Sequence, residues 1–309
     1  MIIGKNYLKL LKAEIIKRLF LNRKPSYSKK YTFSICGIFK DEAPFLKEWI
    51  EFHRLVGVEH FYLYNNNSSD NFLMVLEPYI HNGIVTLIDF PHDHAQFKAY
   101  KSFYETYRNE SQWISFLDID EFICPIFYLK LKEWIKPYEK YPVIQIYSKV
   151  FGTSGLMCHD YSKLVIEQYH VCWNNLYYFG KCFINTDYDI VSFNPICHHA
   201  PTVWMHLLGK RRQIRPVNVF HRSTLGHGEK FFAVNESDPS IQINHYWSKA
   251  WDVYEQKRQK TDVYYERNPK EDFCYFLWHE NKNNSADFSI YRYLMNLKLI
   301  IDSENKQLS

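Results

Sequence analysis

The chain has 309 residues, enough for one large domain or two small ones, and its hydrophobic content of 46% is ample for a sizeable core. The formal net charge of +4 hides an asymmetry: residues 1–30 hold nine Lys or Arg and one acid, whereas the remaining chain is net acidic, which argues against a nucleic-acid-binding protein. The seven cysteines stand singly without a Cys-x-x-Cys pair, which argues against a disulfide scaffold or a zinc module and favours reduced thiols in the cytosol.

Residues 1–30 predict a basic amphipathic helix followed by a linker. Leu8, Leu11, Ile15 and Leu19 recur at helical spacing among lysines. The apolar runs are too short and too often interrupted by lysine for a transmembrane helix, and no secretory signal is evident. Such a helix can lie on an anionic membrane surface, or it can pack on the body or on a second subunit. The sequence leaves both alternatives open.

Short strands and helices alternate from residue 31 to residue 117. Apolar, β-rich runs predict strands at residues 31–39, 60–64, 84–88 and 113–117. The segments between them predict helices at residues 42–56, 72–80 and 96–108, the first capped by Asp41 and closed by Gly57. This order is typical of a parallel sheet covered by helices, in which ligands bind at the carboxyl ends of the strands.

Polar clusters follow three of these strands and should gather at one edge of the sheet. They are Lys40–Glu42, Asn65–Asp70 and Asp118–Glu121. In the last cluster Asp118 and Asp120 come directly after a buried strand, where carboxylates are costly unless they are paired or bind a cation. Residues i and i+2 at a strand end can reach one ion, and hard divalent cations favour oxygen ligands. The spacing alone leaves open a metal site or an acidic turn.

The pattern changes after Pro125. It predicts a short helix at residues 129–135, strands at 143–151, 177–184 and 190–193 (the last two paired), a helix at 247–260 and a helical, partly solvated end from 269. Residues 164–173 are ambiguous, and residues 200–240 show no convincing order. We therefore predict an N-terminal helix and linker (1–30), one main domain (31–265) and a C-terminal helical extension (266–309).

The stretch from Ile35 to Asp70 resembles the opening of glycosyltransferase family 92 and its bacterial relatives. Gln96–Tyr100, Trp113–Phe122 and Ile243–Lys249 resemble further parts of that family. The resemblance implies an α/β, GT-A-like fold with a mixed, mainly parallel sheet flanked by helices, a divalent metal and a nucleotide diphosphate sugar as donor. Leu156 and the stretch 200–240 depart from the family pattern, so the resemblance says more about the donor than about the acceptor.

Several residue roles follow from this resemblance. Asp118 and Asp120 match the metal motif, His245 stands where such enzymes often supply a third ligand, and Glu121 would orient a ligand. Imidazole with carboxylates suits Mn²⁺ better than Ca²⁺, with Mg²⁺ as the other candidate. A hydrogen-bonded core histidine is the alternative for His245.

The predicted donor-binding residues share polar or charged side chains near the strand ends. They are Lys40, Asp41, Glu42, Asn65, Asn66, Asp70, Lys98, Lys101 and Asp118. Their alternatives are helix capping, turn formation and, for the two lysines, a solvated helix face. Family members are thought to invert the sugar's configuration, which requires a general base, and the candidates are Glu167 and then Asp160. A surface acid at a helix end is the simpler interpretation of both.

The sequence therefore predicts a metal-dependent, inverting glycosyltransferase. It would move a hexose, with UDP-galactose as the family-based donor, to a hydroxyl of a surface glycan such as lipopolysaccharide or capsule. The predicted location is cytoplasmic, peripheral on the inner face of the membrane. One alternative is a metal-dependent phosphohydrolase or nucleotidyltransferase, against which the long match from Lys40 to Asp70 argues. The other is a non-catalytic sugar-binding scaffold.

Overall fold

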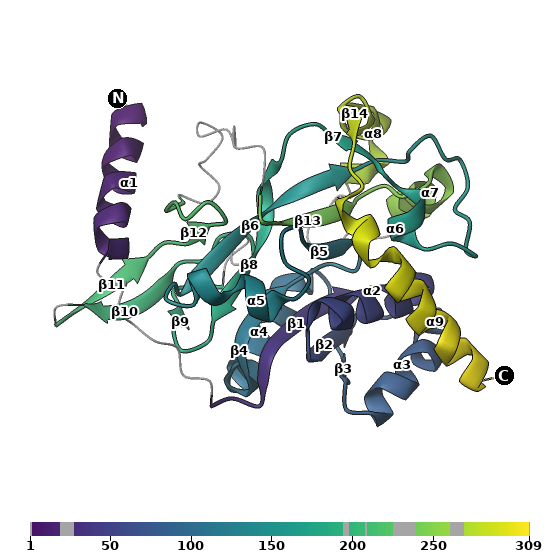
Figure 1. Cartoon of the computed structure of the whole chain (residues 1–309), viewed down its shortest axis with the longest axis horizontal. Helices are drawn as coiled ribbons and strands as arrows, with labels where there is room; N and C mark the ends of the chain where they lie inside the picture. Colours follow the sequence, from purple (N-terminus) through teal and green to yellow (C-terminus); the bar gives the residue numbers. More distant parts are fainter. Residues whose placement is uncertain are drawn as a thin grey trace.

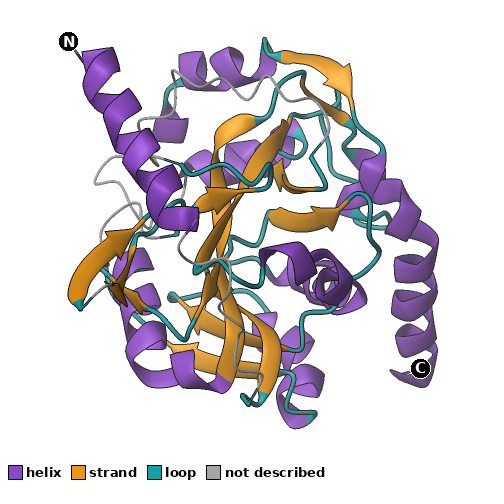
Figure 2. Cartoon of the chain, turned by 60° about the vertical axis from the view of Figure 1, so that its left-hand side comes forward, coloured by secondary structure: helices purple, strands orange, loops and turns teal. Residues whose placement is uncertain are grey.

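The computed structural model describes residues 2–18, 28–193, 198–207, 209–224, 239–259 and 269–308. It shows strands gathered in the middle of the molecule with helices around them (Figures 1 and 2). Leu19, most of the predicted linker, Lys260 and the predicted boundary between residues 265 and 266 lie outside the described residues.

The first half of the chain forms a parallel sheet, as the sequence predicts. Its strands lie in the order β4-β1-β2-β3 and all neighbours are parallel. They are β1 (Tyr31–Phe39), β2 (His60–Asn65), β3 (Val85–Asp89) and β4 (Ser111–Phe116). The connecting helices are α2 (Ala43–Val56), α3 (Phe72–His81) and α4 (Gln96–Tyr107). Because these strands run the same way, their carboxyl ends share one edge of the sheet.

The second half of the sheet is mostly antiparallel. It consists of β5 (Glu121–Pro125), β6 (Val143–Phe151), β7 (Val171–Trp173), β8 (Tyr177–Asn185), β12 (Val217–Asn218), β13 (Ile241–Tyr246) and β14 (Asn283–Ala286). Strand β8 joins the two halves, since it pairs antiparallel with both β4 and β6. The sheet is thus mixed, and it is parallel throughout only in its N-terminal half.

Two predictions for this half are wrong. Residues 177–184 and 190–193 do not pair, because both edges of β8 are taken by β4 and β6. Instead β9 (Asp189–Ile190) joins a separate three-stranded sheet with β10 (Val203–Leu207) and β11 (Lys210–Ile214), in the stretch where the sequence showed no order. The C-terminal extension is also not purely helical, since β14 pairs with β7 at the edge of the main sheet.

The remaining helices cover the ends of the molecule. They are α1 (Ile2–Arg18), α5 (Leu131–Trp134), α6 (Val165–Gln168), α7 (Trp251–Gln259), α8 (Phe273–Glu280) and α9 (Leu294–Leu308), with short 3₁₀ helices at Arg108–Glu110, Lys136–Tyr138, Pro269–Glu271 and Ser289–Tyr293. Helix α1 lies beside the β10–β11 hairpin, at the opposite end from α9 (Figure 1). Within the described ranges, no helix is long and apolar enough to cross a membrane.

The sheet is buried on both faces. In β2, Phe61 and Leu63 belong to the core on one face, together with Trp49 of α2, whereas Tyr62 and Tyr64 belong to the core on the other face. All five side chains are fully buried. Burying a large apolar side chain contributes roughly 2–3 kcal/mol, so these two cores hold the strand ends in a rigid framework for the loops that follow them.

Candidate functional site

The loops after β1 and β2 meet at the carboxyl edge of the sheet, as predicted. Asp41 accepts a hydrogen bond from the Ser69 backbone N–H at 2.6 Å, and Asp70 Oδ2 accepts one from the Ala43 N–H at 2.8 Å. The predicted cap role of Asp41 is therefore wrong: its φ of 53° turns it away from α2, and Asp70 of the neighbouring loop caps that helix. The two loops form one hydrogen-bonded rim.

Asn65, Asn66, Lys98 and Lys101 have structural partners here, whereas Glu42 Oε2 is buried and has no hydrogen-bond partner among the described residues. Asn66 Nδ2 donates to two backbone carbonyls of the segment after β3, both at 2.9 Å, and Asn65 Nδ2 donates to Asp89 at 3.0 Å. Lys98 donates to the Asp93 carbonyl at 3.2 Å and Lys101 pairs with Glu105 on the exposed surface of α4. Turn formation and a solvated helix face account for these contacts, and a role in donor binding stays a prediction.

The segment Asp118–Glu121 is a closed turn between β4 and β5. The Asp118 N–H donates to Glu121 Oε2 and the Glu121 N–H donates to the Asp118 carbonyl, both at 3.1 Å. The indole N–H of Trp49 on α2 donates to the carbonyls of Asp118 and Glu121, at 3.1 and 2.9 Å. On the other side, the Tyr246 N–H of β13 donates to the Asp120 carbonyl at 2.8 Å. The turn is thereby fixed to both a helix and a strand.

On one side of the turn, the carboxylates of Asp118 and Glu121 give an excess of negative charge. Lys181 of β8, only 1% exposed, places Nζ 2.9 Å from Asp118 Oδ2 and 3.0 Å from Glu121 Oε2. Burial alone would raise the pKa of Asp118, but Lys181 outweighs it and lowers that pKa. Gln96 of α4 also donates to Asp118 at 3.1 Å. Two carboxylates thus share one lysine, and the Asp118 side chain remains 35% exposed.

On the other side of the turn, two buried lysines lie near Asp120. Lys257 of α7 places Nζ 2.6 Å from Asp120 Oδ2, and this lysine together with His245 holds the pKa of Asp120 well below its usual range against the effect of burial. Lys249, in the loop between β13 and α7, is fully buried beside Lys257. In the described part of the chain no group accepts a hydrogen bond from Lys249 Nζ, which rests 4.2 Å from the centre of the Phe45 ring.

Lys249 is therefore a buried lysine whose Nζ has no hydrogen-bond acceptor among the described residues. Burial, and then the neighbouring charge of Lys257, lower its pKa to about 8. Its φ of 55° is in the left-handed region, which is uncommon for a residue other than glycine and often marks a functional site. Asp120 and Glu42 both lie near enough to raise the pKa of the two lysines, but Lys249 Nζ donates to neither, so it can donate to one more anionic ligand.

His245 lies between the side chains of Asp120 and Glu121. Strand β13 pairs antiparallel with β5, which sets His245 opposite Glu121. Its Nε2 is 3.5 Å from Asp120 Oδ1 and its Nδ1 is 3.9 Å from Glu121 Oε1. Burial alone would lower the pKa of His245, but Asp120, followed by Glu121 and Asp118, raises it above its usual value.

The three predicted metal ligands are close together, but they are not arranged as a complete metal site. Asp120 Oδ1 and His245 Nε2 are near enough to serve one ion, whereas Asp118 Oδ2 is held by Lys181. Among the residues that the structure describes, no three His, Cys, Asp or Glu side chains form a cluster that could hold a metal. The side chains of Asp120 and His245 are suitable ligands for Mn²⁺ or Mg²⁺, and the partly exposed Asp118 is the candidate for a third ligand.

The two predicted general bases are engaged away from this cluster. Glu167 of α6 pairs with Lys298 of α9 at 2.6 Å. Asp160 is exposed, and its carboxylate accepts hydrogen bonds from the Ser162 side chain at 2.6 Å and backbone at 3.0 Å, which lower its pKa to about 2. A role for either residue as a general base stays a prediction.

Sequence reasoning missed the three lysines of the site. A charge inside the apolar strand 177–185 was a signal for Lys181, because a buried lysine needs carboxylate partners. Lys249 closes the segment 243–249, one of the stretches that resemble family 92, but its side chain was given no role. Nothing local distinguishes Lys257 from the other charged residues of α7.

Comparison with known proteins agrees with the resemblance. The sequence model of glycosyltransferase family 92 matches residues 29–267. Family 92 proteins of Oryza sativa subsp. japonica and Ricinus communis are 25% and 26% identical over 74% and 79% of this chain, and the matches cover 35% and 39% of those proteins. The chain thus corresponds to well under half the length of these relatives.

Among solved structures, S. aureus TarS 1–349 matches 50% of this chain and 47% of its own with 12% identity and a TM-score of 0.35. Its complex with UDP matches 38% and 36% with 16% identity and a TM-score of 0.31. The sequence model, by contrast, extends over most of the chain. The matched residues include the β4–β5 turn and the three lysines of the site, Lys181, Lys249 and Lys257. The chain belongs to glycosyltransferase family 92.

Proposed function

We propose that the protein is a glycosyltransferase that transfers a sugar from a nucleotide diphosphate sugar to a hydroxyl group. The observation that carries this proposal is Lys249, a buried lysine beside Lys257 and Asp120 whose Nζ has no hydrogen-bond acceptor among the described residues. The leaving group of such a transfer is a nucleoside diphosphate, whose negative charge grows as the glycosidic bond breaks. Prearranged cations at that point favour its departure.

The residues of the chain would divide the work as follows. Lys249 and Lys257 would bind the diphosphate, and the rim formed by Lys40–Glu42 and Asn65–Asp70 would contact the nucleoside. Trp49, Lys181 and β13 hold the turn so that Asp118 and Asp120 keep their positions. A Mn²⁺ or Mg²⁺ ion, held by Asp120, His245 and Asp118, would neutralise further phosphate charge when bound.

The finer features of the proposal come from the family resemblance. They are inversion at the sugar carbon, UDP-galactose as donor, and a surface glycan such as lipopolysaccharide or capsule as acceptor. Inversion needs a carboxylate to take the acceptor's proton, and Asp160 and Glu167 remain the candidates. We also propose a peripheral location on the inner face of the cytoplasmic membrane.

Calorimetric titration with UDP, with and without Mn²⁺, tests the donor site. We expect binding by the wild type that Mn²⁺ strengthens and that Asp120→Asn reduces at least tenfold, about 1.4 kcal/mol. Asp302→Asn, the same change at an exposed position of α9, should bind like the wild type. Absence of binding for UDP and for other nucleoside diphosphates would leave the non-catalytic scaffold as the better interpretation.

The identity of the nucleotide product then distinguishes a glycosyltransferase from a phosphohydrolase. A glycosyltransferase incubated with a UDP-sugar releases UDP and free or transferred sugar. A phosphohydrolase would instead cleave within the diphosphate and release a sugar phosphate with UMP. Chromatography of the nucleotide product distinguishes UDP from UMP, so formation of UMP would refute the proposed activity.

A further inference from the structure

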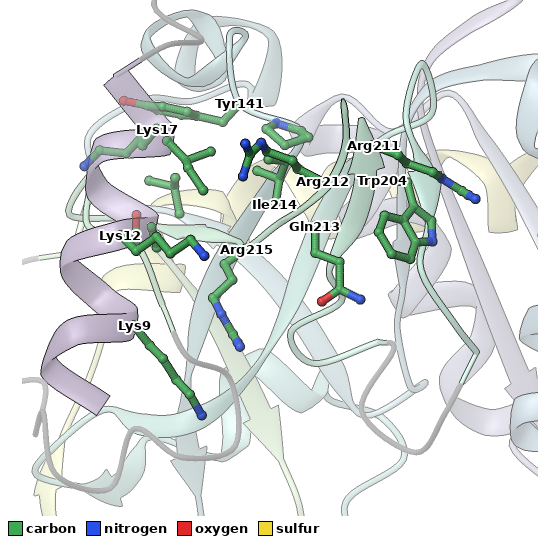
Figure 3. Close-up of a pocket in the computed structure, with 15 residues that line it drawn as sticks. Lys9, Lys12, Lys17, Tyr141, Trp204, Arg211, Arg212, Gln213, Ile214 and Arg215 are labelled. Atoms are coloured by element: carbon green, nitrogen blue, oxygen red, sulfur yellow. The ribbon is translucent and has the colours of Figure 1, made fainter. Parts of the chain in front are cut away.

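A basic cavity lies between α1 and the β10–β11 hairpin (Figure 3). Its volume is about 410 Å³, and its lining contains six Lys or Arg side chains and no Asp or Glu. The basic residues are Lys9, Lys12, Lys17, Arg211, Arg212 and Arg215. Neither α1 nor the hairpin contributes a residue to the β4–β5 turn described above. A concentration of one sign of charge around one cavity favours an anionic ligand.

Polar contacts near its C-terminal end help to fix the helix to the body. Lys17 Nζ donates to the His221 carbonyl at 2.6 Å, and Glu14, which also pairs with Lys17, accepts from the Ser223 N–H at 2.6 Å. Glu14, the acidic residue of α1, is therefore already engaged in these contacts. Further along, the side chains of Lys9 and Lys12 point into the space that Arg212 and Arg215 face from the other side (Figure 3).

Three large apolar side chains of α1 are exposed among its basic residues. Leu8, Leu11 and Ile15 are 65%, 48% and 58% exposed, and their spacing of three and four residues places them on one stripe. Ile16, on a different face, packs against the body. An apolar stripe next to basic side chains is typical of helices that lie in a membrane interface, where leucines enter the acyl boundary and lysines and arginines contact lipid phosphates.

We propose that α1 and the β10–β11 hairpin together form one membrane-binding surface. In it the stripe Leu8, Leu11 and Ile15 enters the leaflet, and the cavity holds the phosphate of an anionic lipid such as phosphatidylglycerol. A soluble acidic glycan would account for the basic cavity but not for the exposed stripe beside it. The inference rests on the peripheral location proposed above and deepens it, because it names the surface and gives the hairpin a role, and it does not depend on the donor chemistry.

The test is sedimentation of the full chain with vesicles of phosphatidylcholine, with and without phosphatidylglycerol. We expect the wild type to bind only the anionic vesicles. Arg212→Gln/Arg215→Gln should bind them roughly 30-fold more weakly, as expected for two basic residues at the surface. Leu8→Asn/Leu11→Asn should show a loss of similar size.

A matched control is Lys132→Gln/Lys163→Gln, which removes two exposed charges outside the cavity and should change vesicle binding less than about threefold. Thermal unfolding of every variant shows whether the fold is retained, and UDP binding by the wild type tests the donor site independently.

Three results would overturn the proposal. Vesicle binding that depends on the α1 stripe but not on Arg212 and Arg215 would remove the hairpin from the surface. Binding of glycerol 1-phosphate or inorganic phosphate without any binding to vesicles would assign the cavity to a soluble phosphate compound. Concentration-dependent dimerisation that Leu8→Asn/Leu11→Asn abolishes would identify a second copy of the chain as the occupant of the stripe.

Discussion

Replacing Lys249 with methionine should stabilise the protein and weaken nucleotide binding at the same time. Burial lowers the pKa of Lys249 from 10.5 to about 8. At pH 7 Lys249 is protonated in both the folded and the unfolded state, but the unfolded state binds the proton more tightly. The difference corresponds to a cost of about 3 kcal/mol. Methionine has a similar unbranched shape and meets the same backbone strain at this position, so the substitution should recover most of that cost and raise Tm by roughly 5 °C or more.

The same substitution removes a cation from the proposed diphosphate site. A hydrogen bond between charged groups contributes about 1.5–3 kcal/mol, so Kd for UDP should rise roughly 10- to 100-fold. Thermal unfolding and calorimetric titration of one preparation measure both effects, with Lys132→Met at an exposed position of α5 as the matched control. A lower Tm together with unchanged UDP affinity would refute the reasoning, because it would mean that Lys249 has an anionic partner within the fold.

Three further predictions concern the framework of the site. Lys181→Met should cost about 3–5 kcal/mol in urea unfolding, because it leaves two carboxylates without their cation, and adding Glu121→Gln should restore part of the loss. Burial raises the pKa of Glu48 from 4.5 to about 7, so its contribution to stability is full below pH 4.5 and is lost as the pH rises through 7. The wild type should therefore lose on the order of 3 kcal/mol relative to Glu48→Gln over this window, and parallel pH profiles would contradict it. Trp49→Phe removes the donor to the β4–β5 turn and should reduce both stability and UDP affinity, whereas Trp134→Phe, which removes an indole donor to Ser240, should reduce stability alone.

The sequence was sufficient for the parallel half of the sheet because its signals there are local. The bounds of β1 are those of the apolar run 31–39, and Gly57 closes α2 with a φ of 111°, a conformation that glycine adopts at little cost. The prediction that the strand-end clusters meet at one edge followed from strand direction alone. It did not require knowledge of any side-chain contact.

The partners of the carboxylates could not be predicted in this way. Lys181 lies 63 residues from Asp118 in the sequence, and Lys257 lies 137 residues from Asp120. Both contacts depend on the antiparallel half of the sheet, where β8 and β13 are brought beside β4 and β5 by long-range pairing. The Asp41 cap failed for the same reason: a residue of the neighbouring loop, Asp70, took its place.

The distribution of charge over the β4–β5 turn connects these contacts to the proposed reaction. On one side Asp118 and Glu121 share Lys181, which leaves an excess of one negative charge. On the other side Lys257 pairs with Asp120, and Lys249 beside it has no hydrogen-bond acceptor among the described residues. A nucleoside diphosphate would accept from Lys249 on the second side, and a divalent cation would lie between Asp120, His245 and Asp118. Because the two ligands attract each other, binding of either one should lower the electrostatic cost of binding the other. A site that served only to stabilise the fold would gain nothing from keeping its buried charges divided in this way, since a fully paired or apolar turn would be more stable.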